Sequence, residues 1–155
     1  MTLATLLSER QIVPELKSDE RWGAIAELVQ TMVDAGKILP ENQEAILASV
    51  RQREETMSTG IGLGIAIPHA SSDRVSEVVA AFGRSAAGVE FDALDAQPVH
   101  FIVLFVVPKD QFQTHLRTLA AIAKFLNDKT VREELAAAST AADILHVIKN
   151  RSPKS

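Results

Sequence analysis

The chain contains no cysteine among its 155 residues. This absence excludes disulfides, thiolate catalysis and cysteine-based zinc sites, and it is consistent with a reducing compartment. Long apolar runs are missing as well: the longest, Phe101 to Pro108, falls far short of the roughly 20 residues that span a bilayer. The N-terminal segment has neither a basic region nor a long apolar stretch, so we expect no signal peptide. We therefore expect a soluble, cytoplasmic protein with no direct membrane insertion.

An excess of positive charge is also absent. Sixteen Lys and Arg residues face 20 Asp and Glu residues, and the resulting net charge of −4 argues against non-specific nucleic-acid binding. Apolar residues make up 46% of the chain and charged residues 23%, close to the globular average, so we expect an ordered fold. No repeat or linker divides the sequence. We predict one domain over residues 1–150 and a frayed tail over residues 151–155.

Helical periodicity dominates both ends of the chain. Apolar residues recur at helical spacing in five segments, and flanking residues suggest their ends. Ser18 is expected to cap the first helix, Gly36 to end it, and Thr140 to cap the last helix. The predicted helices cover residues 19–33, Pro40 to about Glu55, Gln113 to Leu126, Val131 to Ala138, and Ala141 to Lys149.

Three strands are expected between these helices. They cover about Gly64 to Ile67, Glu77 to Arg84, and Val99 to Val107, and a polar connection over residues 88–98 precedes the third. The third strand is apolar on both faces, which is typical of a central strand covered by helices on both sides. The predicted fold class is α/β, with helices on both faces of the sheet.

The most specialised segment is Ser58 to Ala70, which reads STGIGLGIAIPHA. It lacks the Gly-Lys-Ser/Thr ending of a Walker A loop, because Gly64 is followed by Ile65. A dinucleotide fingerprint requires a strand before the glycines and a helix after them, and here the order is reversed. A nucleotide-binding enzyme is therefore a remote alternative. Two interpretations remain: a plain structural turn, or an anion nest of backbone amides with the Ser58 and Thr59 hydroxyls nearby.

Four histidines are candidates for chemistry. His69 follows the first predicted strand, and Pro68 fixes the backbone before it. His115 lies near the start of a helix, where free amides favour anions. His100 and His146 are expected to be structural. No pair of histidines has the spacing of a helical metal site, so we expect no metal.

Arg53 and Glu54 close the second helix just before the glycine segment. In one interpretation they form a solvated helix end, where cations are mildly favoured. In the other, the planar Arg53 guanidinium extends over the loop and binds a phosphate.

These residues together resemble a known family. Arg53-Glu54, the segment from Ser58 to His69, and His115-Leu116 with Leu119 and Ala123 are similar to the EIIA domain of the fructose/mannitol class. This domain is the phosphocarrier module of the phosphoenolpyruvate-dependent phosphotransferase system, and the standalone nitrogen-regulatory EIIA (PtsN-like) proteins belong with it. The resemblance covers nearly the whole chain and implies a central mixed β-sheet flanked by helices.

The resemblance also implies roles for individual residues. His69 would accept a phosphoryl group from an HPr-type protein, and His115 would stabilise it. Arg53, Ser58, Thr59 and Gly60 would bind or support the phosphate. The phosphoryl group would come from phosphoenolpyruvate through Enzyme I and HPr, with no cofactor.

The segment after the active histidine departs from many relatives. They carry glycine and a basic residue there, whereas this chain has Ala70-Ser71-Ser72-Asp73, so docking of partners is less predictable than the chemistry. The acceptor is expected to be a separate EIIB domain in sugar transport, or a regulated target protein. A domain without fused EIIB or EIIC favours the regulatory role, and sugar transport is the alternative. The sequence predicts neither the sugar, the target nor the oligomeric state.

Overall fold

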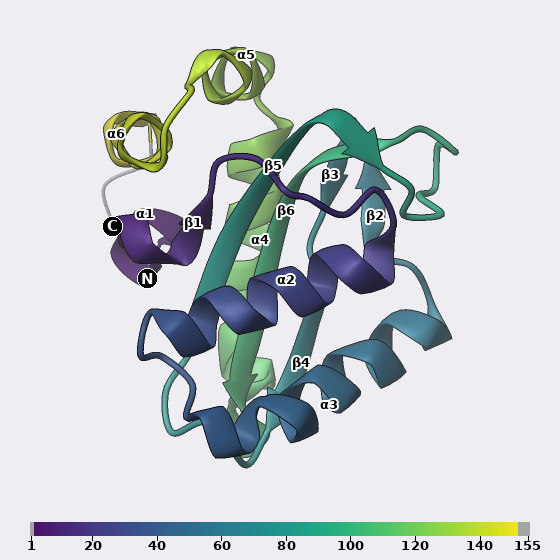
Figure 1. The fold of residues 1–155 in the computed structure, drawn as a ribbon, viewed down its shortest axis with the longest axis vertical. Coiled ribbons are helices and arrows are strands. Elements are labelled where there is room, and N and C mark those ends of the chain that lie inside the picture. The colour runs from purple at the N-terminus through teal and green to yellow at the C-terminus, as the bar shows by residue number, and fades with distance from the viewer. Residues whose placement is uncertain (1, 152–155) are drawn as a thin grey trace.

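A six-stranded mixed sheet forms the centre of the fold (Figure 1). The structure is a computed structural model, and it describes residues 2–151. The strands are β1 (Ile12–Val13), β2 (Gly60–Gly62), β3 (Ile65–Ala66), β4 (His69–Ser72), β5 (Val79–Val89) and β6 (Val99–Pro108). Their order is β1-β5-β6-β3-β2, and β4 also pairs with β6.

The long strand β6 organises this sheet. It pairs antiparallel with β5 on one edge, and on its other edge it pairs parallel with β3 and then β4. Ile65 of β3 is opposite Phe101, and His69 of β4 is opposite Phe105. Between the two short strands, the Pro68 carbonyl accepts a hydrogen bond from Phe105 N at 3.0 Å. Residues 65–72 therefore lie along one edge of β6, and His69 lies near its carboxyl end.

Helices cover both faces of the sheet (Figure 1). Successive residues of β6 alternate between two cores, as the pleat of a strand requires. Ile102 and Leu104 pack with α2 and α3, whereas Val103 and Phe105 pack with the core of α1, α4, α5 and α6. The predicted two-sided burial of this strand is confirmed. So are the α/β class and the mixed sheet.

Five of the helices agree with the predicted segments except at their ends, and α1 is additional. The helices are α1 (Leu3–Leu6), α2 (Arg21–Asp34), α3 (Gln43–Thr56), α4 (Leu116–Asn127), α5 (Lys129–Ala137) and α6 (Ala141–Arg151). Short 3₁₀ turns precede α3 and α4, over Pro40–Asn42 and Gln113–His115. Gly36 ends α2 with a φ of +76°, and Thr140 Oγ1 accepts a hydrogen bond from Asp143 N, so both of these predictions are confirmed.

The predicted cap of α2 is wrong. Glu20, not Ser18, is the N-cap residue, and its carboxylate accepts hydrogen bonds from Trp22 N and Gly23 N. A carboxylate at this position satisfies two free amides and also interacts favourably with the helix dipole. The Ser18 hydroxyl instead donates to the Glu20 carbonyl.

Three predictions about the strands also need correction. The glycine segment is not a loop before one strand, because its first part forms β2, which pairs antiparallel with β3. The residues after His69, expected as a loop over Ala70 to Asp73, belong mostly to β4, which pairs with β6. Strand β5 continues to Val89, beyond the predicted end at Arg84, with an irregularity in its pairing to β6. The sequence does not indicate this extension, because the small residues Ser85 to Gly88 lack the β-branched and aromatic side chains typical of strands.

The N-terminal segment contributes elements that have no clear signal in the sequence. α1 and the two-residue strand β1 were not predicted, and β1 adds to the sheet edge parallel to β5. At the other end, α6 continues to Arg151. The remainder of the predicted frayed tail, residues 152–155, lies outside the described residues.

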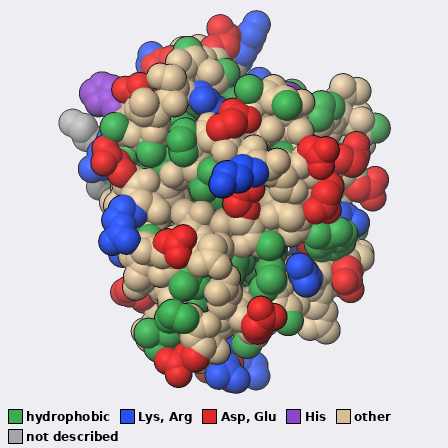
Figure 2. Space-filling view, viewed as in Figure 1, with side chains coloured by type: hydrophobic (Ala, Val, Ile, Leu, Met, Phe, Trp, Pro, Cys, Tyr) green, Lys and Arg blue, Asp and Glu red, His purple; other side chains and the backbone are tan. Residues whose placement is uncertain are grey.

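Charge is unevenly distributed over the surface. Figure 2 shows acidic side chains gathered at one edge of the face that carries α2 and α3. The β5–β6 connection reaches that edge in Figure 1, and its Asp92 and Asp95 are exposed, as is Glu90 at its start. No helix within residues 2–151 is both long enough and apolar enough to span a membrane.

Candidate functional site

His69 is held firmly at the start of β4. Its side chain is only 9% exposed, and its ring stacks on Phe112 with the ring centroids 5.8 Å apart. Pro68 before it and the pairing of β4 with β6 after it fix the backbone on both sides. The imidazole therefore has one well-defined position.

One hydrogen bond determines which ring nitrogen of His69 is available. Nδ1 lies 2.8 Å from the Ile67 carbonyl oxygen. A carbonyl oxygen only accepts, so Nδ1 carries the hydrogen and donates it. In the neutral ring the lone pair then resides on Nε2, which makes Nε2 the nucleophilic atom.

The surroundings keep this ring neutral. Burial lowers the pKa of His69 below its usual 6.5, and this is the largest influence. The hydrogen bond to Ile67 opposes the shift, the nearby Arg53 charge adds to it, and Glu54 opposes it. At neutral pH His69 is consequently an uncharged base with a free lone pair.

Two hollows meet at His69 and Arg53. The first, the α3 hollow, has a volume of about 480 Å³ and is lined by Gln52, Arg53, Thr56, His69, Ser71 and Phe112 among others. The second, the α4 hollow, has a volume of about 390 Å³ and is lined by Arg53, Met57, Thr59, His69, Leu94 and Leu116 among others.

Arg53 is half-buried in the last turn of α3, and its Nη1 donates to the Met57 carbonyl at 3.1 Å. This hydrogen bond holds the guanidinium over the chain that leaves the helix. Its charge influences the pKa of His69, so the two groups are within electrostatic reach of each other. The interpretation of Arg53 as part of an anion site is thus compatible with its position.

Glu54 is a functional candidate that the sequence analysis missed. The sequence suggested a solvated helix end, but this side chain is only 1% exposed. Its carboxylate accepts hydrogen bonds from Thr59 N at 2.9 Å and Thr59 Oγ1 at 2.6 Å, and Arg21 Nη1 lies 3.6 Å away. Because a buried carboxylate is costly without partners, these contacts fix the backbone at Thr59.

A chain of hydrogen bonds connects Glu54 to His69. Glu54 holds Thr59, the Thr59 carbonyl accepts from Ile67 N at 3.1 Å, and the Ile67 carbonyl accepts from His69 Nδ1. The position of Ile67, and hence the orientation of the imidazole, depends on this chain. In the sequence, the signal for this contact is the hydroxyl residue Thr59, which follows Glu54 by five positions and stands just before β2.

Ser58 and Gly60, two of the other predicted phosphate ligands, make their contacts with other parts of the protein. The Ser58 hydroxyl donates to the Phe91 carbonyl at 2.7 Å and accepts from Gly60 N at 3.1 Å. Gly60 packs against Ala93 so closely that a Cβ atom at Gly60 would lie 2.7 Å from the Ala93 Cβ. In this structure Ser58, Thr59 and Gly60 brace the β2 end of the site.

The tip of the glycine segment lies away from His69. Gly62 at the end of β2 and the turn residues Leu63 and Gly64 all have positive φ, and Gly64 lies next to His100. Leu63 N donates to the Asp95 carboxylate at 3.2 Å. An anion nest would use this amide, but here the amide already donates its hydrogen bond to the Asp95 carboxylate.

Two phenylalanine side chains lie beside the rings of His115 and His69. It immediately precedes α4, and its ring meets the edge of Phe105 with centroids 6.3 Å apart. Phe105 is the register partner of His69, and the Phe112 carbonyl accepts from His115 N at 3.1 Å. The structure thus brings His69 and His115 to the same end of the sheet. Phe112, which the sequence analysis missed, has one signal: it is a lone aromatic residue among polar neighbours, three residues before His115.

The remaining histidines lie elsewhere. His100 Nδ1 donates to the Ser85 carbonyl at 2.8 Å, and His146 is exposed on α6 beside Asn150. Among residues 2–151, no three His, Cys, Asp or Glu side chains gather so as to hold a metal ion.

Comparison with known proteins places this site in context. Residues 5–151 match the family described as phosphoenolpyruvate-dependent sugar phosphotransferase system, EIIA 2. A fructose-specific EIIA component of the phosphotransferase system from Haloferax volcanii is 38% identical over 126 residues, which cover 81% of this chain and 80% of that protein. A nitrogen regulatory protein from Escherichia coli K12 is 38% identical over 115 residues, 74% of this chain and 71% of its own length. The crystal structure of nitrogen regulatory protein IIA-Ntr from Neisseria meningitidis superposes with a TM-score of 0.84 at 27% identity, covering 94% of this chain and 98% of that one.

Proposed function

The chain belongs to the phosphoenolpyruvate-dependent sugar phosphotransferase system EIIA 2 family, and from that premise we propose that it carries a phosphoryl group on Nε2 of His69. The observation that carries the proposal is the hydrogen bond from His69 Nδ1 to the Ile67 carbonyl. It leaves the lone pair on Nε2, in a buried ring that borders two hollows. A neutral imidazole is a competent nucleophile and also a good leaving group, as a carrier requires.

The proposed transfer is a displacement at phosphorus. His69 Nε2 forms a bond to the phosphorus of a phosphohistidine on an HPr-type donor, and the donor's phosphorus–nitrogen bond breaks with its electron pair returning to the donor ring. Each ring keeps the hydrogen on its other nitrogen, so no proton has to move. Catalysis then consists mainly of positioning and charge stabilisation.

Arg53 and His115 are the proposed stabilising groups. Arg53 borders both hollows beside His69, and its guanidinium has donors suited to phosphoryl oxygens. His115 immediately precedes α4, where its Nε2 lies 3.4 Å from Gln111 Oε1 and it lines neither hollow; we propose that it donates a hydrogen bond to the same oxygens when a phosphoryl group is present. Because the Ser58 and Thr59 hydroxyls already donate within the protein, we assign them and Gly60 a supporting role.

An apolar rim around His69 supports docking of a protein partner. Met57 is 65% exposed and Leu94 is 77% exposed, and Ile61 and Leu116 are exposed beside them. All four line the α4 hollow. Exposed apolar side chains gathered at one place are typical of an interaction surface. We propose that this rim receives the HPr-type donor and, in turn, the acceptor.

The onward acceptor is proposed in two forms. The relatives include a fructose-specific EIIA component and nitrogen regulatory proteins, and the representative of each kind is 38% identical to this chain. The first name favours transfer to a cysteine on a separate EIIB domain, with sugar transport as the outcome. The second favours a regulated target protein that distinguishes the phosphorylated from the unphosphorylated form.

The carrier function is tested by incubating the protein with phosphoenolpyruvate, Enzyme I and HPr and measuring an acid-labile phosphoryl group. We expect the wild type and a His146→Ala control to be phosphorylated and a His69→Ala variant to remain unmodified. Labelling of His69→Ala at the wild-type level would overturn the proposal. Transfer to a purified EIIB domain would then identify the transport role, and capture of a target by one phosphorylation state would identify the regulatory role.

A further inference from the structure

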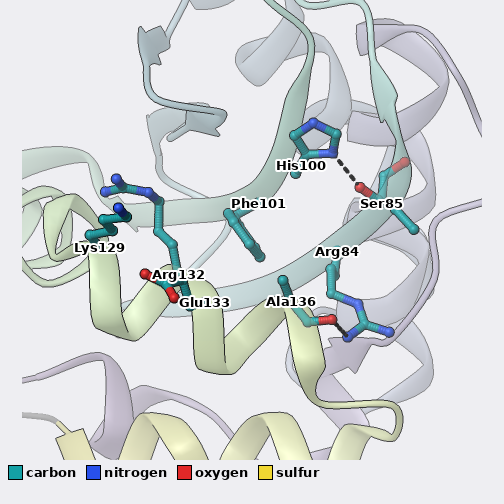
Figure 3. A pocket seen from close by; sticks show the side chains of 9 residues that line it. Arg84, Ser85, His100, Phe101, Lys129, Arg132, Glu133 and Ala136 are labelled. Carbon is teal, nitrogen blue, oxygen red and sulfur yellow. Dashed lines mark hydrogen bonds between the residues drawn. The ribbon is translucent and has the colours of Figure 1, made fainter.

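A third hollow lies away from His69, between the sheet and α5. It has a volume of about 550 Å³ and is lined by Arg84 and Ser85 of β5, His100 and Phe101 of β6, and residues of α5 that include Lys129 and Arg132. Figure 3 shows Phe101 in the middle, with Lys129 and Arg132 on one side and Arg84 on the other. We call this hollow the α5 groove.

The α5 groove is rich in positive charge. Arg84, Lys129 and Arg132 border it, and Glu133 is the single acidic residue in its lining. Among the described residues, none of the three cations lies within ion-pair distance of a carboxylate. This is unusual in a chain with a net charge of −4, whose acidic side chains gather at another edge (Figure 2).

The two arginines are held in place by neutral groups. Arg84 Nε donates to the Pro14 carbonyl at 2.9 Å, and its Nη1 donates to the carbonyls of Leu135 and Ala136. Arg132 Nη1 donates to two carbonyls at the end of α4. Within residues 2–151, Nη2 of each arginine has no hydrogen-bond partner. Carbonyl oxygens orient a guanidinium without cancelling its charge, so both side chains present positive charge at little further cost in entropy.

Apolar side chains and one histidine also line the groove. Phe101 lies in the middle of the groove (Figure 3), and Ala86 and Ala136 also line it. His100 donates through Nδ1 to the Ser85 carbonyl, so in the neutral ring the lone pair is on Nε2, which is then available as an acceptor for a ligand. A ligand that fits these features has an apolar body and an anionic group.

We propose that the α5 groove binds a small organic anion, a carboxylate or phosphate attached to an apolar body about the size of one aromatic ring. Lys129 and Arg132, which lie together on one side of Phe101, would bind the anionic group, Phe101 would contact the body, and Arg84 would add positive charge on the other side. The groove shares no lining residue with the two hollows at His69. Phe101 also precedes Phe105, the partner of His69, by four residues on β6, or about 13 Å. The site therefore adds to the proposed carrier function and does not depend on it.

The proposal is tested by NMR titration of the ¹⁵N-labelled protein with phenyl phosphate, phenylacetate and the neutral 2-phenylethanol. We expect amide shift changes over residues 84–86, 100–101 and 129–136 with at least one anion, and much smaller changes with the alcohol. The stronger anion identifies the preferred head group. No change with either anion up to millimolar concentration, or equal changes with the alcohol, would overturn the proposal.

Substitutions provide a second test. Lys129 is exposed and has no hydrogen bond among the described residues, so Lys129→Glu should leave the fold intact and weaken binding about fivefold, as one surface charge contact would. Lys124→Glu on the exposed surface of α4 makes the same charge change outside the groove and should leave the affinity unchanged. Ala136→Phe should fill the groove and abolish the shifts. Equal affinities for the Lys129 and Lys124 variants would contradict the assigned site. His69→Ala should bind the anions normally, which separates failure of this proposal from failure of the carrier function.

Discussion

Replacing Glu54 with glutamine tests the hydrogen-bond chain that orients His69. The carboxylate accepts from Thr59 through both oxygens, at 2.9 and 2.6 Å. An amide keeps one accepting oxygen, but its NH₂ group would face a donor of Thr59. One charge-assisted hydrogen bond is lost and a buried donor loses its partner, so we expect destabilisation of about 2–3 kcal/mol. For a chain of this length that corresponds to a fall in Tm of roughly 5–10 °C.

The substitution should also change the titration of His69. Glu54 raises the pKa of His69 in the wild type, so removal of its negative charge should lower that pKa further. The matched control is Glu55→Gln, because Glu55 is the exposed neighbour of Glu54 on the same helix. Thermal unfolding and an NMR pH titration of the His69 ring are the two assays. Equal stability of Glu54→Gln and Glu55→Gln, or a rise in the pKa of His69 in Glu54→Gln, would refute the role given to Glu54.

Four further predictions follow from the same contacts. Arg53→Gln should raise the pKa of His69 in an NMR titration, because the guanidinium charge lowers that pKa in the wild type. The same substitution should slow phosphorylation by HPr in a quenched time course, and an unchanged rate would show that Arg53 is not part of the site. The pKa of His69 is lower in the folded than in the unfolded protein, so the unfolded state binds the proton first as the pH falls. The free energy of unfolding should therefore be highest above pH 6.5 and should decrease between pH 6.5 and the folded pKa. Urea unfolding of His69→Gln should not show this decrease. Gly60→Ala should destabilise the protein by about 1–3 kcal/mol in urea unfolding, since the new Cβ would meet Ala93 at 2.7 Å; wild-type stability would show that β2 and the β5–β6 connection move apart freely. His115→Ala should still accept phosphate and transfer it poorly, which a chase with the acceptor measures; unimpaired transfer would end the role given to His115.

The sequence predicted the sheet centre and the main helices because their signals are local. The strand Val99 to Val107 is apolar on both faces, and a strand of that kind belongs in the middle of a sheet whatever surrounds it. The stop at Gly36 and the cap at Thr140 are likewise properties of single residues. His69 was singled out for the same reason, since Pro68 and the glycine segment mark it within a few positions.

The parts that could not be predicted depend on distant partners. Strand β1 exists because Ile12 and Val13 pair with residues 82 and 83 of β5, a contact that their own sequence does not indicate. Glu54 at a helix end is typical of a solvated residue, and only the return of the chain at Thr59 buries it. The same applies to Phe112, whose partner is the ring of His69.

In the proposed carrier, Nε2 of His69 bears the phosphoryl group while Nδ1 keeps its hydrogen bond to the Ile67 carbonyl. The direct measurement is NMR of the protein labelled with ¹⁵N in its histidine side chains, before and after phosphorylation through Enzyme I and HPr. We expect the Nε2 resonance of His69 to shift to a phosphorylated value and to couple to ³¹P, while Nδ1 remains protonated. A phosphorus coupling to Nδ1 of His69, or to a nitrogen of any other histidine, would contradict this assignment.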